Sequence, residues 1–333
     1  MTVVELAMYP ELPGRLFAPA VATRLRTAAR VDLASPLTEF RSPEARERLR
    51  RATILLTCWG SPPLDEQALA DAPRLRAVVH AAGTVKGHLP PAVFARGIQV
   101  SSAAAANAVP VAEYTLAMIL LANKAVPALA REYHARREDL ALLRRGHDVG
   151  NHGRVVGVIG ASRIGRRVLE LLRPFDLEPL LADPHVDAGT AASLGARLVG
   201  LDQIFALSDV VSVHAPATPR TRGMVTAGRL AAMRDGATLI NTARGSLVDQ
   251  DALIAELVTG RLSAVLDVTE PEVPPADSPL WELPNVVLTP HLAGSLGNEV
   301  ARLGAAAADE VLRLAAGEPL LHRVDLETLS ITA

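Results

Sequence analysis

One stretch, residues 155–168, constrains the fold more than any other part of the sequence. The apolar run 155–159 leads into Gly160-Ala161-Ser162-Arg163-Ile164-Gly165, and the residues after it have the apolar spacing of a helix. A strand, a glycine turn and a helix in this order predict a dinucleotide site, because N–H groups at the helix N-terminus suit a pyrophosphate. Ser162 stands where the second glycine of a GxGxxG motif is expected.

Composition sets the broad class of the protein. A chain of 333 residues exceeds the usual size of one domain, which predicts about two. The formal net charge of -2 argues against nucleic acid or an anionic membrane as a partner. The single cysteine, Cys58, lies in an apolar run, so we expect a buried thiol in a reducing compartment. Neither a signal peptide nor an apolar run of about 18 residues is seen, and we therefore expect a cytoplasmic protein.

Short apolar runs alternate with helix-like segments on both sides of the glycine turn, and this alternation predicts parallel sheets covered by helices. Before the turn, the predicted strands are 3–8, 53–57, 75–80 and 98–101, and the helices are 20–29, 65–70 and 90–95. After it, the predicted strands are 180–182, 210–213, 237–240, 265–266 and 286–288, and the helices are 188–194, 201–207, 227–233 and 252–259, with Gly260 as the C-cap of the last.

The fold class predicted is α/β, with two doubly wound parallel-sheet domains and a cleft between them. We expect a flavodoxin-like domain, residues 1–101 plus 298–333, and a Rossmann dinucleotide-binding domain, residues 102–297. The apolar segment 109–124 predicts a helix that crosses between the domains, with Pro110 in its first turn. The arginine-rich segment 131–145 is typical of a solvated helix face. A last helix, about 298–316, is expected to pack on the first domain.

Polar residues follow several strands of the second half, where a doubly wound sheet binds its ligands. They are Asp183, His214, Arg244, Asp267 and His291. Asp183 lies at the end of the second strand, where a carboxylate accepts hydrogen bonds from the ribose hydroxyls and repels a 2′-phosphate. This favours NAD over NADP. The alternative is an ordinary turn aspartate before Pro184.

Several segments in fixed order also carry a family resemblance. They are residues 107–113 (NAVPVAE), the Gly160 turn, 211–216 (VSVHAP), 241–245 (NTARG), 266–272 (LDVTEPE) and 288–291 (LTPH). The chain resembles the D-isomer-specific 2-hydroxyacid dehydrogenases, which include phosphoglycerate, glycerate and D-lactate dehydrogenases. The resemblance implies a reversible, NAD-linked reduction of a 2-oxo acid to a D-2-hydroxy acid. It also implies a homodimer formed through the nucleotide domain, with residues 109–145 as the interface.

The resemblance assigns roles to individual residues. Arg244 would hold the substrate carboxylate and carbonyl, since a guanidinium fork matches two acceptors. His291 would exchange a proton with the carbonyl oxygen, and Glu272, rather than Glu270, would orient the imidazole and favour its protonated form. Asp267 would bond the nicotinamide amide. The expected cofactor-binding residues are Gly160, Ser162, Arg163, Ile164, Gly165, Asp183, His214, Ala215, Pro216, Thr242, Ala243, Asp267, His291 and Gly294.

Backbone amides of Gly83, Thr84 and Val85 are expected to bind the substrate carboxylate, and Lys86 and His88 to add positive character beside them. No metal site is expected. Trp59 either lines the substrate pocket or packs in the core. An NAD-sensing, corepressor-like binding protein is the rival function, and the intact set of Arg244, Glu272 and His291 argues against it. A formate dehydrogenase ranks lowest, because the resemblance to that enzyme would place Gln at position 272.

Overall fold

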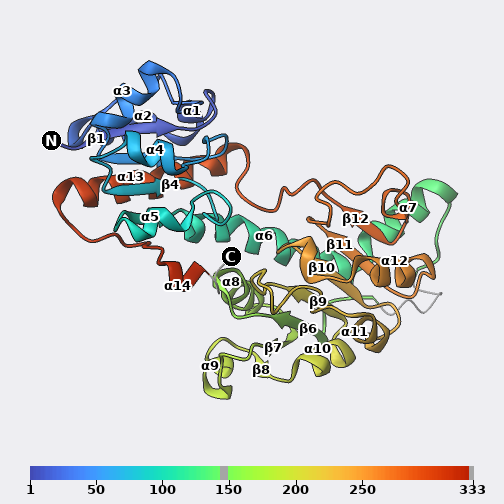
Figure 1. Cartoon of the computed structure of the whole chain (residues 1–333). Coiled ribbons are helices and arrows are strands. Elements are labelled where there is room, and N and C mark those ends of the chain that lie inside the picture. Colours follow the sequence, from blue (N-terminus) through green and yellow to red (C-terminus); the bar gives the residue numbers. More distant parts are fainter. Residues whose placement is uncertain (143–148, 330–333) are drawn as a thin grey trace. The chain divides into compact units, whose positions relative to one another are not determined.

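The computed structural model describes residues 1–142 and 149–329, which form two compact units (Figure 1). Unit 1 comprises Met1–Ala108 and Ser295–Ala333, and unit 2 comprises Val109–Gly294. These units begin and end within a few residues of the domain boundaries predicted after residue 101 and before residue 298. Within unit 1, the side chain of Asn107 joins the two segments of the chain, because its Oδ1 accepts the backbone N–H of Ser295 at 2.9 Å.

Unit 1 contains a five-stranded sheet in which all neighbouring strands are parallel. The strand order β2-β1-β3-β4-β5 is the flavodoxin-like order, as predicted. The strands are β1 (Val3–Ala7), β2 (Arg30–Val31), β3 (Ile54–Thr57), β4 (Ala77–His80) and β5 (Gln99–Ser102).

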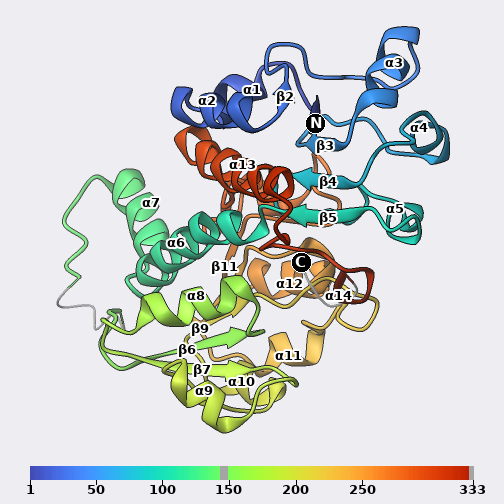
Figure 2. The same cartoon turned by 90° about the vertical axis from the view of Figure 1, so that its left-hand side faces the viewer.

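Helices cover both faces of this sheet, because successive side chains of each buried strand point to opposite faces (Figure 2). Ile54 and Leu56 pack toward α1 (Leu12–Leu16), α2 (Pro19–Ala28) and α13 (Val300–Ala316). Leu55 packs toward α3 (Pro43–Arg51), α4 (Glu66–Asp71) and α5 (Pro91–Ala95). The last long helix does pack on unit 1. A Cβ at Gly304 in α13 would lie 1.9 Å from the carbonyl oxygen of Leu16, so only glycine allows this approach.

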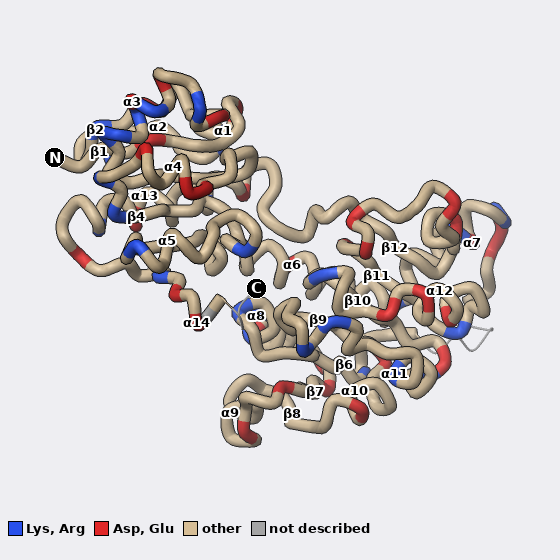
Figure 3. Tube along the Cα trace, viewed as in Figure 1, with Lys and Arg blue, Asp and Glu red and all other residues tan. Residues whose placement is uncertain are grey.

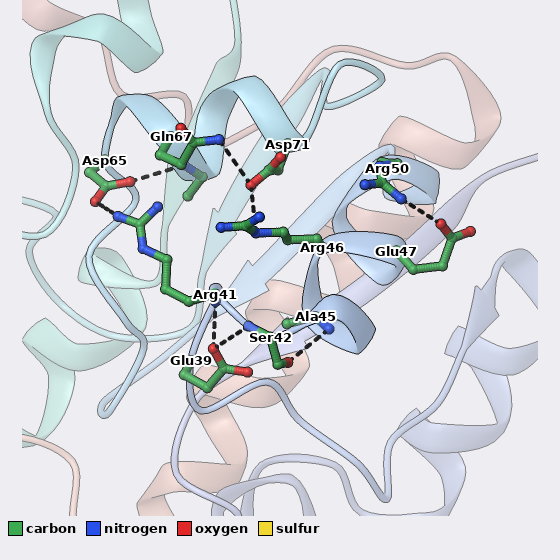
Figure 4. A network of polar contacts seen from close by, with 11 residues as sticks. Glu39, Arg41, Ser42, Ala45, Arg46, Glu47, Arg50, Asp65, Gln67 and Asp71 are labelled. Atoms are coloured by element: carbon green, nitrogen blue, oxygen red, sulfur yellow. Dashed lines mark hydrogen bonds and ion pairs between the residues drawn. The ribbon is translucent and has the colours of Figure 1, made fainter.

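Helix α3 was not predicted, because its sequence, PEARERLRR, has few apolar residues. Two of them, Ala45 and Leu49, are buried, and the Ser42 side chain caps the helix by accepting the N–H of Ala45 at 3.2 Å. Ion pairs join the segment to α4: Arg46 to Asp71 at 3.4 Å, and Arg41 to Asp65 (Figure 4). Tertiary packing and these polar contacts therefore stabilise the helix at this position.

Unit 2 contains a seven-stranded parallel sheet in the order β12-β11-β10-β9-β6-β7-β8. Counted from β6, this is the Rossmann order with one further strand at the β12 edge. The strands are β6 (Arg154–Ile159), β7 (Leu177–Ala182), β8 (Arg197–Leu198), β9 (Val210–Val213), β10 (Thr238–Asn241), β11 (Ser263–Leu266) and β12 (Val286–Leu288). The short edge strands β2 and β8 are the ones that sequence patterning missed.

Helices also cover both faces of the second sheet. One layer contains α6 (Ala104–Asn123), α8 (Arg163–Leu172) and α9 (Ala188–Ser193). The other contains α10 (Leu201–Leu207), α11 (Ala227–Ala232) and α12 (Gln250–Val258). Helix α12 ends at Val258 with Thr259 as its C-cap, so Gly260, which was predicted as the C-cap, lies one position beyond it with a φ of 76°. The remaining elements are α7 (Val126–Arg136), α14 (Leu326–Leu329) and three short 3-10 helices, η1 (Gly245–Leu247), η2 (Pro279–Trp281) and η3 (Gly297–Glu299).

Helix α6 begins earlier than predicted, and Pro110 lies inside it rather than in its first turn. The alanines that precede Asn107 extend the helix backwards, because alanine has the highest helix propensity. By length and composition alone α6 is apolar enough to cross a membrane, and about 33% of its most apolar window is buried. Ala112 and Ile119 pack in the unit 2 core. These contacts explain the apolar residues on one face of the helix, but not the apolar residues on the other face.

Helix α7 has no buried residue, in agreement with the solvated face expected of this segment. Arg131 nevertheless anchors it, since its guanidinium donates to the carbonyl oxygens of Leu283 at 3.0 Å and Val286 at 2.7 Å. Positions 143–145 of the predicted arginine-rich segment lie outside the described residues. Basic and acidic residues are interspersed in both units, consistent with the small net charge (Figure 3).

Candidate functional site

The carboxyl ends of the central strands of unit 2 form one row. The parallel register aligns Ile159 with Ala182 and with Val213, Val213 with Asn241, Asn241 with Leu266, and Leu266 with Leu288. The residue after each strand end therefore emerges at the same edge of the sheet. These residues are Gly160, Asp183, His214, Thr242, Asp267 and Thr289.

The turn after β6 has no room for side chains at its two glycines. Gly160 has a φ of 95°, and a Cβ there would lie 2.9 Å from the backbone nitrogen of Ala215. A Cβ at Gly165 would lie 2.0 Å from the carbonyl oxygen of Gly160. Ser162 is the N-cap of α8, and its Oγ accepts the N–H of Gly165 at 3.3 Å. The turn thus presents the first N–H groups of a ten-residue helix, at Arg163 and Ile164, together with a serine hydroxyl that still has its own proton to donate.

Asp183 lies directly after β7, and its carboxylate contacts the glycine turn. Oδ2 accepts the N–H of Ala161 at 2.7 Å, and Oδ1 accepts the N–H of His185 at 2.8 Å. Each oxygen keeps a second lone pair for a further donor. Asp183 can therefore stabilise the turn and accept a hydrogen bond from a ribose hydroxyl at the same time. The sequence had presented these two roles as alternatives.

His214 is buried, with only 3% of its surface exposed, and it packs beneath the turn. Its Nε2 pairs with Ser212 Oγ at 2.8 Å, and Nδ1 is buried with no partner. Burial lowers the pKa of His214 to about 3, so the ring is neutral at pH 7. A neutral, buried ring fits a wall of the site better than an acid or base. Ala215 is buried as well, and Pro216 is half-buried.

Two loops of the site touch at Gly245, directly after Arg244. A Cβ at Gly245 would lie 2.1 Å from the carbonyl carbon of Thr269, so the β10 loop packs against the loop that carries Glu272. Asn241 closes the first loop, because its side chain donates to the carbonyl oxygen of Arg244 at 2.9 Å and accepts the N–H of Ala243 at 3.1 Å. Sequence reasoning did not assign this role, although an asparagine at the end of a strand is a known turn signal.

The Arg244 guanidinium is partly buried, and one of its nitrogens donates to the carbonyl oxygen of Ala243 at 2.6 Å. Burial lowers the pKa of Arg244, and the nearby Glu272 carboxylate opposes that shift. An arginine stays charged under such shifts, so a cation faces the loop of Glu272. Thr242 is buried, and its hydroxyl pairs with that of Thr115 in α6 at 3.2 Å.

His291 and Glu272 form the closest polar contact of the site, with Nδ1 and Oε1 2.5 Å apart. Glu270, the other carboxylate of this loop, instead forms an ion pair with Arg222 at 3.0 Å. The geometry thus pairs His291 with the glutamate that sequence reasoning selected. Both side chains of the pair are about half exposed, and with Nδ1 engaged, Nε2 is the nitrogen left to exchange a proton.

Asp267 fixes the turn that carries His291. It is 1% exposed, and its carboxylate accepts Thr289 Oγ1 at 2.6 Å and the backbone N–H groups of Leu292 at 2.8 Å and Ala293 at 2.9 Å. His291 itself has a φ of 53°, an uncommon value for a residue with a side chain, and its N–H donates to the carbonyl oxygen of Asp267. Asp267 is therefore a positioning residue for His291. The predicted contact with a nicotinamide amide stays a prediction.

Thr269 and Thr289 were not predicted as parts of the site. Thr269 Oγ1 donates within its own loop, to the carbonyl oxygens of Pro271 and Glu272. Thr289 joins Asp267 to Tyr114 in α6 through hydroxyl contacts. The Thr289 contacts connect segments that are distant in the sequence, so nothing in its sequence position marks it. Gly294 is the last residue of unit 2.

In unit 1, the predicted carboxylate loop follows β4. The Thr84 hydroxyl accepts the N–H of Lys86 at 3.1 Å, and a Cβ at Gly83 would lie 3.2 Å from the Asn107 amide nitrogen. The Val85 side chain is buried, so only its backbone is left to bind a ligand. The expected positive character of His88 is wrong, because burial lowers its pKa and its ring packs on His80 with centroids 4.7 Å apart. Burial likewise lowers the pKa of His80 to about 3.

Comparison with known proteins identifies the family. Residues 116–293, just over half of the chain and all within unit 2, match the model of the D-isomer specific 2-hydroxyacid dehydrogenase NAD binding domain. The chain belongs to this family. Within the described residues, no group of three or more His, Cys, Asp or Glu side chains is arranged to hold a metal ion.

Individual relatives agree with this assignment. The chain is 37% identical over 259 residues to a D-3-phosphoglycerate dehydrogenase of Mycobacterium tuberculosis, covering 77% of this chain and 48% of the relative. It is 34% identical to the enzyme of that name from Archaeoglobus fulgidus, over 70% of this chain and 44% of the relative. The chain thus spans about half the length of these relatives. Apo D-mandelate dehydrogenase of Rhodotorula graminis has a similar structure, with a TM-score of 0.81, 25% identity and 97% of each chain covered.

Proposed function

We propose that the protein interconverts a 2-oxo acid and a D-2-hydroxy acid with NAD as the redox partner. The observation that carries the proposal is the 2.5 Å contact between His291 Nδ1 and Glu272 Oε1, in loops that adjoin the charged Arg244. An imidazole oriented by a carboxylate suits proton exchange with a carbonyl oxygen. A guanidinium suits the substrate carboxylate and carbonyl.

The residues present fit a dinucleotide. Glycine at positions 160 and 165 lets the turn pack closely on its neighbouring backbone, and the N–H groups of Arg163 and Ile164 at the N-terminus of α8 suit a pyrophosphate. Arg163, Ile164 and Ser162 would hold the phosphates, and Asp183 the adenosine ribose. His214, Ala215, Pro216, Thr242, Ala243, Asp267 and Gly294 would line the rest of the cofactor site. When bound, the nicotinamide supplies or accepts the hydride.

The chain's own residues then perform three tasks. Arg244 binds and orients the substrate carboxylate, assisted by the backbone amides of Gly83, Thr84 and Val85. His291 donates a proton from Nε2 to the carbonyl oxygen during reduction and takes it back during oxidation. Glu272 holds the ring through Nδ1 and stabilises the imidazolium that forms when the proton returns.

Substitutions at these loops test the assignment, with NADH oxidation followed against glyoxylate, pyruvate, hydroxypyruvate, phenylpyruvate and phosphohydroxypyruvate. We expect His291→Ala to lower kcat by about 10²- to 10⁴-fold, the usual contribution of a general acid, with NADH affinity within about twofold. Glu272→Gln should lower kcat as well. Glu270→Gln is the matched control, because it alters an exposed carboxylate two residues away that pairs with Arg222, and we expect near-normal turnover.

Near-normal turnover by His291→Ala contradicts the catalytic assignment. Equal losses in the Glu272 and Glu270 variants contradict the choice of Glu272. If the unaltered protein binds NADH tightly yet reduces none of these acids, the rival function, an NAD-sensing binding protein, is favoured. The carboxylate at position 272, in contact with His291, argues against a formate dehydrogenase.

We also propose that the protein is a cytoplasmic homodimer formed through α6 and α7. The apolar, mostly unburied face of α6 supports this, together with the exposed side chains of Leu121, Val126 and Tyr133. A second copy of the chain would bury this surface, and sedimentation equilibrium measures whether it does. The single buried cysteine is compatible with the reducing cytoplasm, and cell fractionation tests that location.

A further inference from the structure

Unit 1 exposes two aromatic side chains at the carboxyl edge of its sheet. Tyr9 follows β1 and is 53% exposed, and Trp59 follows β3 and is 40% exposed. They are the only Tyr and Trp residues in unit 1. Since β1 and β3 are neighbours with Ala7 opposite Thr57, both aromatic residues emerge at the edge where such sheets bind ligands. Trp59 is therefore not a core residue, and a place beside the substrate stays a prediction.

The two residues are fixed beside one another. The N–H of Tyr9 donates to the carbonyl oxygen of Trp59 at 2.9 Å. The Tyr9 ring lies against Gly60, where a Cβ would be 2.4 Å from ring carbon Cδ1. Gly60 also has a φ of 79°, which favours glycine. The backbone hydrogen bond and the close approach at Gly60 therefore hold Tyr9 and Trp59 next to each other.

The backbone on either side of Trp59 is anchored. The Cys58 thiol donates to the carbonyl oxygen of Ala81 at 3.1 Å. At the other end of the loop, Asp65 caps α4 by accepting the N–H of Ala68 at 2.9 Å, and it pairs with Arg41 (Figure 4). An exposed aromatic ring on a fixed backbone loses little conformational freedom when it binds a ligand.

The same edge continues into the proposed carboxylate loop. Strands β3 and β4 pair with Thr57 opposite His80, and the N–H of Ala81 donates to the carbonyl oxygen of Thr57 at 2.7 Å. Across the three loops 8–11, 58–64 and 81–90, the sequence holds a single basic residue, Lys86, and a single acidic one, Glu11. These three loops therefore lack the several cationic donors that a phosphate ester would need.

We infer that this edge selects 2-oxo acids whose side chain is aromatic or large and apolar, with Trp59 and Tyr9 as its contact residues. The inference rests on the proposed dehydrogenase function and names the substrate class that function would serve. Aromatic rings gain by packing on other rings, whereas a small acid such as glyoxylate has no side chain to place there. A phosphorylated acid would bring two negative charges to an apolar surface.

The first experiment compares kcat/KM for phenylpyruvate with that for glyoxylate and for phosphohydroxypyruvate, using NADH. The unaltered protein should prefer phenylpyruvate. Trp59→Ala should lower the phenylpyruvate-to-glyoxylate ratio by about tenfold, and Trp59→Phe should restore most of it. Trp281→Phe changes the other, exposed tryptophan, which lies in unit 2, and should leave the ratio unaltered. A preference for phosphohydroxypyruvate or glyoxylate, or an unchanged ratio in Trp59→Ala, overturns the inference and leaves the dehydrogenase function intact.

A second measurement separates this inference from the proposed function. In the Trp281→Phe variant, Trp59 is the single tryptophan. Its emission should change saturably on titration with D-phenyllactate in the presence of NAD, and not with D-glycerate. That response without turnover of any acid refutes the dehydrogenase function while supporting an aromatic ligand at this edge. No response, with turnover of small acids intact, refutes the inference alone.

Discussion

Replacing Gly165 with alanine tests the physical basis of the nucleotide turn. The added Cβ would lie 2.0 Å from the carbonyl oxygen of Gly160 and 3.2 Å from its carbonyl carbon. A relaxed contact between carbon and oxygen needs about 3.3 Å, so the turn and helix α8 must separate by roughly 1 Å. Because the obstacle is backbone, no side-chain rotation relieves it. Strain of this kind costs about 1–3 kcal/mol of stability.

The displacement acts directly on cofactor binding. Each hydrogen bond from a backbone N–H to a charged phosphate contributes about 1.5–3 kcal/mol. Losing one such bond weakens NADH binding by about 10- to 100-fold. We therefore expect Gly165→Ala to raise the Kd for NADH by that factor and to lower the free energy of unfolding.

Gly228→Ala is the matched control for this substitution. Gly228 also lies in a helix of unit 2, α11, but a Cβ there would find its nearest neighbour, Thr226 Oγ1, at 4.0 Å. Alanine is the better helix former, so this variant should gain up to about 1 kcal/mol of stability and keep its NADH affinity. Nicotinamide fluorescence gives the Kd, and urea titration gives the free energy of unfolding. If the two variants behave alike, the steric explanation of Gly165 is refuted.

Two further predictions concern cofactor choice and assembly. Asp183→Ala should shift the NADH-to-NADPH ratio of kcat/KM by about tenfold toward NADPH; Asp183→Asn, which keeps acceptor oxygen but loses the charge, should reproduce part of the shift. An unaltered protein that already prefers NADPH contradicts this role of Asp183. Leu121→Glu, on the exposed face of α6, should convert a dimer to monomers in sedimentation equilibrium. Val258→Glu, at a more exposed apolar position at the end of α12, should not. A monomeric unaltered protein, or a dimeric Leu121→Glu variant, contradicts the proposed interface.

Much of the fold could be read from the sequence because the strands of a parallel α/β sheet are buried on both faces. Runs such as Ile54–Thr57 and Val210–Val213 are almost uniformly apolar, and turn residues delimit them. Helix α3 and the start of α6 were missed for different reasons. The first is polar apart from two buried positions, and the second begins in an alanine run with no apolar period.

The residues of the candidate site can also be divided into those that local sequence determines and those that tertiary contacts decide. The sequence by itself determined the glycine turn and the polar residue after each strand, because these depend on local backbone geometry and on chain order. Only the tertiary structure decided which side chains meet. It paired His291 with Glu272 and Glu270 with Arg222, buried His214 in a neutral form, and placed Trp59 at an exposed sheet edge. These outcomes depend on contacts between residues far apart in the chain, and on how much water each group retains, which local sequence does not encode.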